Sequence, residues 1–174
     1  MEESKSKNSK SERFISQVIV WNADTGIAAK LRRGNNPATE YMAWEYISSW
    51  CDLTNPFQLQ PYLTVAAAVA KEKIKVDGNL GLGQALALCY PEKSDSDPAK
   101  ARLRRILSCT DNLEVCSLLR SILGFISAKG IPISYAKLLD DLLYFSERTR
   151  KKWAMDFYRT GKGGLQDDSD KNSD

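Results

Sequence analysis

Apolar residues recur at helical spacing along most of this chain. At about 100° per residue, Leu103, Ile106 and Leu107 gather on one side of the segment 100–107, and the segment 113–128 carries an apolar arc of the same period. No stretch alternates strictly between apolar and polar residues, and the alanine-rich segment 61–75 is poor material for a strand. The pattern therefore predicts an all-α fold.

Capping residues and prolines predict the helix boundaries in the first half of the chain. Asp24 is a typical N-cap, and Gly34 is placed to follow the last turn of a helix. Pro56 and Pro61 are expected to break the chain before the alanine-rich helix. Helices are predicted over 12–22, 27–33, 38–51 and 61–75. The third is dense in aromatic residues, which is more typical of a core helix than of a base-stacking platform.

The second half shows similar signals. A helix end at Gly78 is expected to precede a closely packed helix over 83–90. Asp111 and Glu114 form a capping box for a helix over 113–128. Ser134 caps a further leucine-rich helix, and a basic, aromatic helix over 146–159 follows it.

Composition shifts divide the chain. The segment 92–98 (EKSDSDP) is the best candidate for a hinge, and we expect one small helical bundle over 14–93 and a second over 98–160. Residues 1–13 are polar and of mixed charge, and residues 163–174 are acidic, so both are expected to be disordered tails.

The clustering of the cations is more informative about a binding partner than the net charge of +3. Residues 14–162 hold 20 Lys and Arg against 15 Asp and Glu, so the part expected to fold is more basic than the whole chain. The candidate polyanion-binding residues lie mostly opposite apolar stripes. They are Lys30, Arg32, Arg33, Lys100, Arg102, Arg104, Arg105, Arg120, Arg148 and Arg150. The alternative is that these cations are only solvated.

Two cations, Arg150 and Lys137, are expected to have specific partners within the chain. Arg150 falls within the apolar face of its helix, so it is expected either to pair with a buried acid or to stack beside aromatic rings. Lys137 is positioned three and four residues before Asp140 and Asp141 and is expected to pair with one of them.

Enzymatic and metal chemistry find little support in the sequence. There is no histidine, and the four cysteines show no C-x-x-C spacing, so no metal or cofactor is expected and the thiols are predicted to be free in a reducing cytoplasm. The glycines of residues 78–83 lack the strand and the Gly-Lys-Ser/Thr ending of a phosphate loop. A metal-dependent nuclease built on Asp95, Asp97, Asp140 and Asp141 is a weak alternative, and no catalytic residue is assigned. No apolar run reaches about 18 residues, so no membrane association is expected.

Several segments together resemble the CasB family, the small subunit of the type I-E CRISPR surveillance complex Cascade. They are KLRRGNNPATEYMAWEYISSW, NLGLGQALA and the stretch ARLRRILSCTDNLEVCSLLRSILGFISAKGIPISYAKLLDDLLYFSERTRKKWAMDFY. The resemblance runs from about Ser16 to Tyr158 and rests on the whole series. One departure is Gly83-Gln84, where relatives often carry a basic residue after Leu-Gly.

The resemblance implies an all-helical, non-catalytic protein present as two copies in a crRNA-guided complex. Its implied partners are the crRNA, the target DNA, the displaced non-target strand, a second copy of itself and the backbone and large subunits of Cascade. It implies that basic surface residues hold the guide–target duplex and the displaced strand. The alternative is a helical protein–protein adaptor that does not touch nucleic acid, an idea that rests on the small-residue face around Ser117 and Ser121.

Overall fold

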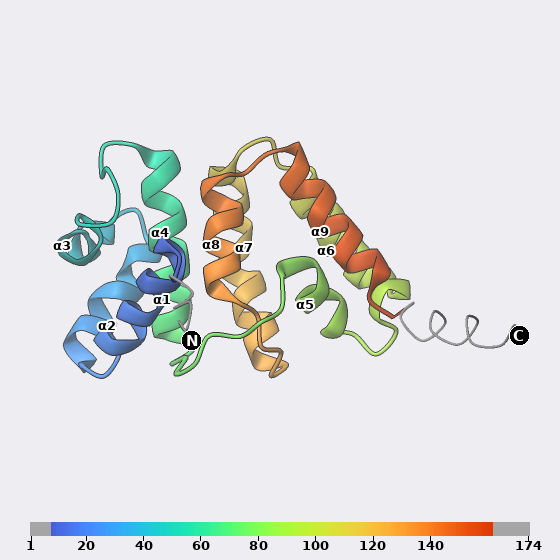
Figure 1. Cartoon of the computed structure of the whole chain (residues 1–174), viewed down its shortest axis with the longest axis horizontal. Helices are drawn as coiled ribbons and strands as arrows, with labels where there is room; N and C mark the ends of the chain where they lie inside the picture. The colour runs from blue at the N-terminus through green and yellow to red at the C-terminus, as the bar shows by residue number, and fades with distance from the viewer. Residues whose placement is uncertain (1–7, 162–174) are drawn as a thin grey trace, which may run out of the picture.

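The computed structural model describes residues 8–161, and this part of the chain is helical, as predicted (Figure 1). Its only pairing of strand type is an isolated parallel bridge between Leu80 and Ile133. The elements in chain order are α1 (Lys10–Trp21), α2 (Thr25–Arg32), η1 (Arg33–Asn35), η2 (Glu40–Ala43), α3 (Trp44–Ile47), α4 (Pro56–Lys71), α5 (Leu82–Leu88), η3 (Lys93–Asp95), α6 (Asp97–Leu107), α7 (Asn112–Ala128), α8 (Tyr135–Leu143) and α9 (Glu147–Arg159).

Helix α4 is the most deeply buried element. Every residue from Pro61 to Ala70 is buried, and α1, α2, α7 and α8 all pack against this helix (Figure 1). Four of its residues are alanines at positions 66–68 and 70. Small side chains all round a helix allow neighbours to approach it from several sides, so the alanine-rich composition accounts for its central place.

Helices α5 and α6 pack against α9. Helix α5 makes its most extensive contacts with α9, and α6 also contacts both (Figure 1). A Cβ placed on Gly83 would lie 2.1 Å from the carbonyl oxygen of Trp153, so the two backbones touch at this point. The close packing expected for this helix is confirmed. Because α5 precedes the expected hinge and α9 follows it, packing runs across residues 92–98, and the division into two bundles stays a prediction.

The prediction that Pro61 breaks the chain is wrong, because Pro56 opens α4 and Pro61 lies inside it. A proline within a helix leaves the carbonyl four residues earlier without its N–H partner. Here that carbonyl belongs to Phe57, and it accepts a hydrogen bond of 2.8 Å from Nδ2 of Asn112. The same amide nitrogen donates at 2.8 Å to the carbonyl of Leu142, in the last turn of α8. One side chain therefore satisfies two backbone acceptors that their own helices cannot.

Other boundaries also differ from those predicted. Helix α1 begins at Lys10, inside the expected N-terminal tail, because Ser9 and Glu12 form a capping box. The helix expected over 38–51 is reduced to η2 and α3, since Asn36 accepts a hydrogen bond from Ala38 and turns the chain first. Within this segment, Tyr41 is 60% exposed, so the aromatic residues are not all core. The other residues of the expected tails, 1–7 and 163–174, lie outside the described part.

The connection after α4 also departs from prediction, since the helix ends at Lys71 and not at Gly78. Gly78 lies instead against residues 132–133, where a Cβ would be 2.1 Å from the carbonyl oxygen of Pro132. Asp111 caps α7 through the Glu114 N–H, as predicted, but the Glu114 carboxylate accepts from Thr110 and not from the cap residue. All four cysteines are free, as expected.

Replacing Asn112 with Ala should lower the free energy of unfolding by about 2 kcal/mol, because buried carbonyls lose their donor. Chemical denaturation monitored by circular dichroism measures this change. In a Pro61→Ala background the restored N–H supplies Phe57 with a helical partner, so the same substitution should be milder by about 1 kcal/mol. Equal losses in both backgrounds would show that the Phe57 carbonyl does not depend on Asn112.

Replacing Gly83 with Ala should destabilise the fold by about 1–3 kcal/mol, because the added methyl group meets backbone that cannot move aside. Gly81→Ala is the matched control, since its Cβ would meet only the Asp156 carboxylate, at an ordinary 3.5 Å. Thermal unfolding of the two variants compares them directly. A similar melting temperature for both would contradict the close contact between α5 and α9.

Candidate nucleic-acid interface

Helix α6 is amphipathic and carries the densest run of cations. The Ser96 side chain accepts from the Ala99 N–H and starts the helix, and Ala99, Leu103 and Ile106 are buried. Arg104 and Arg105 are exposed and have no carboxylate within 4.0 Å in the part of the chain that the structure describes. Lys100 is held at 4.0 Å from Asp97 in the first turn. The outer face of α6 therefore presents net positive charge.

The α6–α7 surface brings aromatic and basic groups together. The guanidinium carbon of Arg102 lies 4.0 Å from the centroid of the Phe125 ring, and Nζ of Lys129 lies 5.7 Å from it. Arg102, Arg105, Ser121 and Phe125 line a hollow of about 180 Å³ between the two helices. We call Arg102, Arg105, Phe125 and Lys129 the α6–α7 surface. Lys129 is not among the residues predicted from the sequence, although it lies one helical turn after Phe125 and on the same side of α7.

Arg104 and Arg120 do not join this surface directly. On α6, Arg104 lies about 160° around the helix from Arg102, whereas Arg105 lies about 60° from it. Arg120 is about 140° around α7 from Phe125 and is half-buried, and its buried Nε has no hydrogen-bond partner among the described residues. The α6–α7 surface thus unites only part of the predicted set.

The cations of α9 make more internal contacts than expected. Nη1 of Arg150 donates at 3.1 Å to the carbonyl of Leu107, the last residue of α6. Within the described residues, Arg150 neither pairs with an acid nor stacks on a ring. A cation at a helix C-terminus satisfies a free carbonyl and complements the helix dipole, which explains this placement. Arg148 is exposed beside Lys151 and Lys152, and Lys151 pairs with Glu147 at 3.2 Å.

Asp141 fixes α9 to α8. Its carboxylate accepts hydrogen bonds of 2.8 Å from Nζ of Lys152 and of 2.8 Å from Nε1 of the buried Trp153. Lys137 donates instead to the carbonyl of Asn79, at 2.8 Å, so the predicted pairing with Asp140 or Asp141 is wrong. The pairing fails because the Asn79 carbonyl lies within reach of Lys137 and because Lys152 and Trp153 already donate to Asp141.

The α2 cluster consists of Lys30, Arg32 and Arg33. Helix α2 lies at the opposite end of the molecule's long axis from α6 and α9 (Figure 1). Lys30 forms an ion pair with Glu45 at 2.6 Å, and this hydrogen bond raises the pKa of Lys30 above its usual value. Nη1 of Arg33 lies 3.1 Å from the sulfur of Met42. Arg32 is exposed and lines a groove between α1, α2 and α4. Only Arg32 of this cluster has no polar contact within the described residues.

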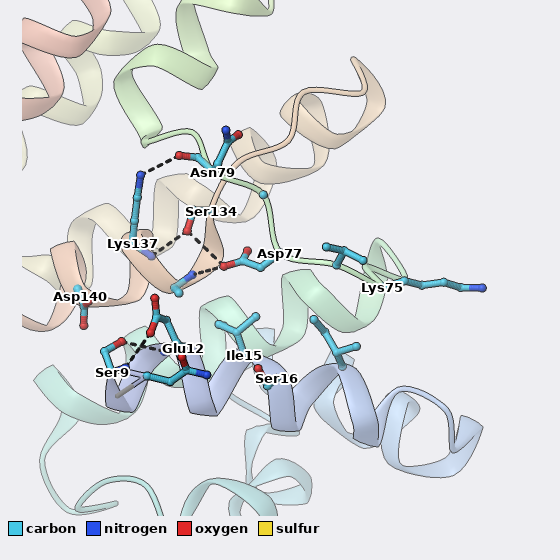
Figure 2. A pocket seen from close by; sticks show the side chains of 15 residues that line it. Ser9, Glu12, Ile15, Ser16, Lys75, Asp77, Asn79, Ser134, Lys137 and Asp140 are labelled. Carbon is cyan, nitrogen blue, oxygen red and sulfur yellow. Dashed lines mark hydrogen bonds between the residues drawn. The ribbon is translucent and has the colours of Figure 1, made fainter. Parts of the chain in front are cut away.

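A second hollow, of about 610 Å³, lies between α1, α8 and the connection 75–79 (Figure 2). Asp77 points at the first turn of α8 and accepts from the N–H groups of Tyr135, at 2.7 Å, and Ala136, at 3.2 Å. Asp140, on the same side, accepts a hydrogen bond from Ser11. These carboxylates therefore join α1, α8 and the connection to one another.

Metal-ligating groups and membrane-spanning helices were sought among residues 8–161. Within residues 8–161, no group of three His, Cys, Asp or Glu side chains is placed to hold a metal ion. Burial raises the pKa of the Cys116 thiol to about 11, which disfavours the reactive thiolate. No helix in the same range is long and apolar enough to cross a bilayer.

Comparison with solved structures shows the same fold elsewhere. A chain of a "CRISPR RNA-guided surveillance complex" is 19% identical, with a TM-score of 0.72 over 88% of this chain and 94% of that one. The CasB of M. ruber is 22% identical, with a TM-score of 0.70 over 90% and 97%. CasB from Thermus thermophilus is 25% identical, with a TM-score of 0.66 over 87% and 99%.

Comparison by sequence adds a family assignment. None of the curated proteins compared with the chain matches it. The family model described as CRISPR-associated protein Cse2 matches residues 28–158, a range that contains α6, α7 and all the candidate basic residues. With most of its length matched by this model, the chain belongs to the Cse2 family of CRISPR-associated proteins.

Proposed function

We propose that this protein is a non-catalytic subunit of a Cascade-type CRISPR surveillance complex and that it holds nucleic acid on the α6–α7 surface. The observation that carries the proposal is the gathering of Arg102, Arg105 and Lys129 around Phe125. None of these three cations has a carboxylate within 4.0 Å among the described residues. Family membership and the likeness to a chain of a surveillance complex support the same proposal.

The geometry suits phosphate contacts. Phe125 lies against the guanidinium of Arg102, which restricts the arginine before any ligand arrives, while the N–H groups at its edge stay available. Phosphate contacts position a strand without reading its sequence. A subunit that must accept every guide and every target needs contacts of this kind.

The ligands and partner subunits are inferred from the family resemblance. The ligands are the crRNA–target duplex and the displaced DNA strand, and the protein partners are the backbone and large subunits together with a second copy of the chain. Arg104 and Arg148, both exposed, extend the basic surface beyond the α6–α7 hollow. Lys30 and Arg150, by contrast, are engaged within the chain and contribute mainly to its structure.

Membership of a complex is tested by affinity purification of the tagged chain from its native host. We expect co-purification of a short guide RNA and of further CRISPR-associated subunits, identified by RNA sequencing and mass spectrometry. A chain recovered alone would contradict membership.

The double change Arg102→Gln and Arg105→Gln should weaken binding to single-stranded DNA for every sequence alike. The slope of log K against log salt should shrink by about 1.4, because roughly 0.7 is lost with each phosphate contact on a single strand. Fluorescence anisotropy over a range of salt concentrations measures the slope, and circular dichroism checks that the variant is folded.

Arg13→Gln with Lys71→Gln is the matched control for this experiment. Both residues are exposed, both lie outside the α6–α7 surface, and their loss changes the net charge by the same amount. The control should bind with nearly unchanged slope. If both double variants lose slope equally, binding reflects only net charge. If neither does, the adaptor alternative gains, and the exposed Tyr41 and Phe57 become its first candidate contacts.

A further inference from the structure

An apolar groove with a basic rim lies between α1, α2 and the end of α4. Its volume is about 630 Å³. Ile19, Ala28 and Ile74 contribute apolar walls, and Arg32, Lys73 and Lys75 contribute the only charges among its lining residues. A pocket of this size and composition selects a ligand that is apolar at its centre and anionic around it.

Two acidic residues close to the groove in sequence, Asp24 and Glu72, point to groups outside the groove. Asp24 caps α2, accepting at 2.8 Å from the Gly26 N–H and at 3.1 Å from the Ile27 N–H. Glu72, between two exposed lysines, extends the other way, with its Oε1 placed 3.6 Å from where a Cβ on Gly124 of α7 would be. Neither Asp24 nor Glu72 therefore neutralises the positive charge at the groove.

Lys73 occupies a backbone conformation that normally belongs to glycine. Its φ is 51°, and it follows the C-cap residue Glu72. Ile74 N–H bonds to the Val69 carbonyl at 3.1 Å, and Lys73 N–H points to the Ala70 carbonyl at 3.4 Å, which completes a Schellman motif. A lysine at this position strains the backbone but directs a cation to the groove. Strain of this kind accumulates at ligand-binding positions.

The lining disfavours a nucleobase. No aromatic ring is among the groove's lining residues, so it has no platform for base stacking. Aliphatic walls under three cations instead match a peptide with one aliphatic side chain next to carboxylates. The chain itself carries such a segment, because Leu165 is followed by Asp167, Asp168 and Asp170.

We propose that the groove binds the segment 165–170 of a second copy of this chain. Helix α9, from which this segment continues after Gly161, ends at the far end of the long axis from α1 and α2 (Figure 1). To reach the groove of its own copy, the segment would have to cross the whole molecule. If a second copy is placed end to end with the first, its segment 165–170 starts next to the groove. This inference does not depend on nucleic-acid binding.

The test uses a fluorescein-labelled peptide of residues 163–174, titrated into the full chain at low salt and followed by anisotropy. We expect saturable binding that weakens about three- to tenfold with Lys73→Gln and Lys75→Gln together. A peptide with Leu165→Ser should bind about tenfold more weakly, since its aliphatic anchor is gone. Lys151→Gln with Arg159→Gln, which removes the same charge from exposed positions away from the groove, should leave binding nearly unchanged.

Lys73→Gly separates a contact from a structural effect. Glycine relieves the strained backbone, so this variant should melt at a higher temperature and yet bind the peptide more weakly. Higher stability with unchanged peptide affinity would remove Lys73 from the site. Absence of saturable binding, or equal losses in the groove and control variants, would overturn the proposal. So would a loss of labelled oligo(dT) binding in the groove variant while peptide binding is unaffected, since the groove would then belong to nucleic acid.

Sedimentation of the full chain tests the second copy. We expect association that grows with concentration and is reduced when Leu165→Ser, Asp167→Asn and Asp168→Asn are introduced together. If the peptide binds but the full chain stays monomeric above the peptide's dissociation constant, the second copy is excluded and the proposal fails.

Discussion

The amide of Asn112 holds the centre of this fold together. Pro61 lies inside α4 and deprives the Phe57 carbonyl of its helical partner, while the Leu142 carbonyl is left free where α8 ends. Asn112, the first residue of α7, donates to both at 2.8 Å. Three helices therefore meet at one side chain, and the most buried helix of the chain is fixed in place by a hydrogen bond that compensates its own proline.

The basic surface depends on this packing and on a second junction at the other end of the molecule. Arg150 of α9 binds the terminal carbonyl of α6, and Asp141 of α8 binds both Lys152 and Trp153 of α9. Gly83 lets α5 approach α9 until their backbones touch. Helix α6 thus sits on a rigid frame, so Arg102 and Arg105 meet a ligand without the ordering that a mobile arm would require.

Internal contacts divide the cations into two groups. Lys30, Arg150 and Lys152 are bound to groups of the chain itself and stabilise junctions between elements. Arg102, Arg105 and Lys129 surround Phe125 without a carboxylate partner in the described part. The nucleic-acid proposal rests on the second group, and the groove at Arg32, Lys73 and Lys75 forms a separate basic site with aliphatic walls.

Sequence patterns alone predicted the helical class, the amphipathic character of α6, the N-caps Asp24, Asp111 and Ser134, and the family resemblance. These follow from local periodicity and from side chains that bond to backbone a few residues away. Three features depend on tertiary packing: Pro61 stays inside a helix, Arg150 binds a carbonyl of α6, and Lys129 joins Arg102 at Phe125. In each case the partner comes from a distant segment or another helix, and periodicity along one segment holds no information about which group another segment will bring beside it.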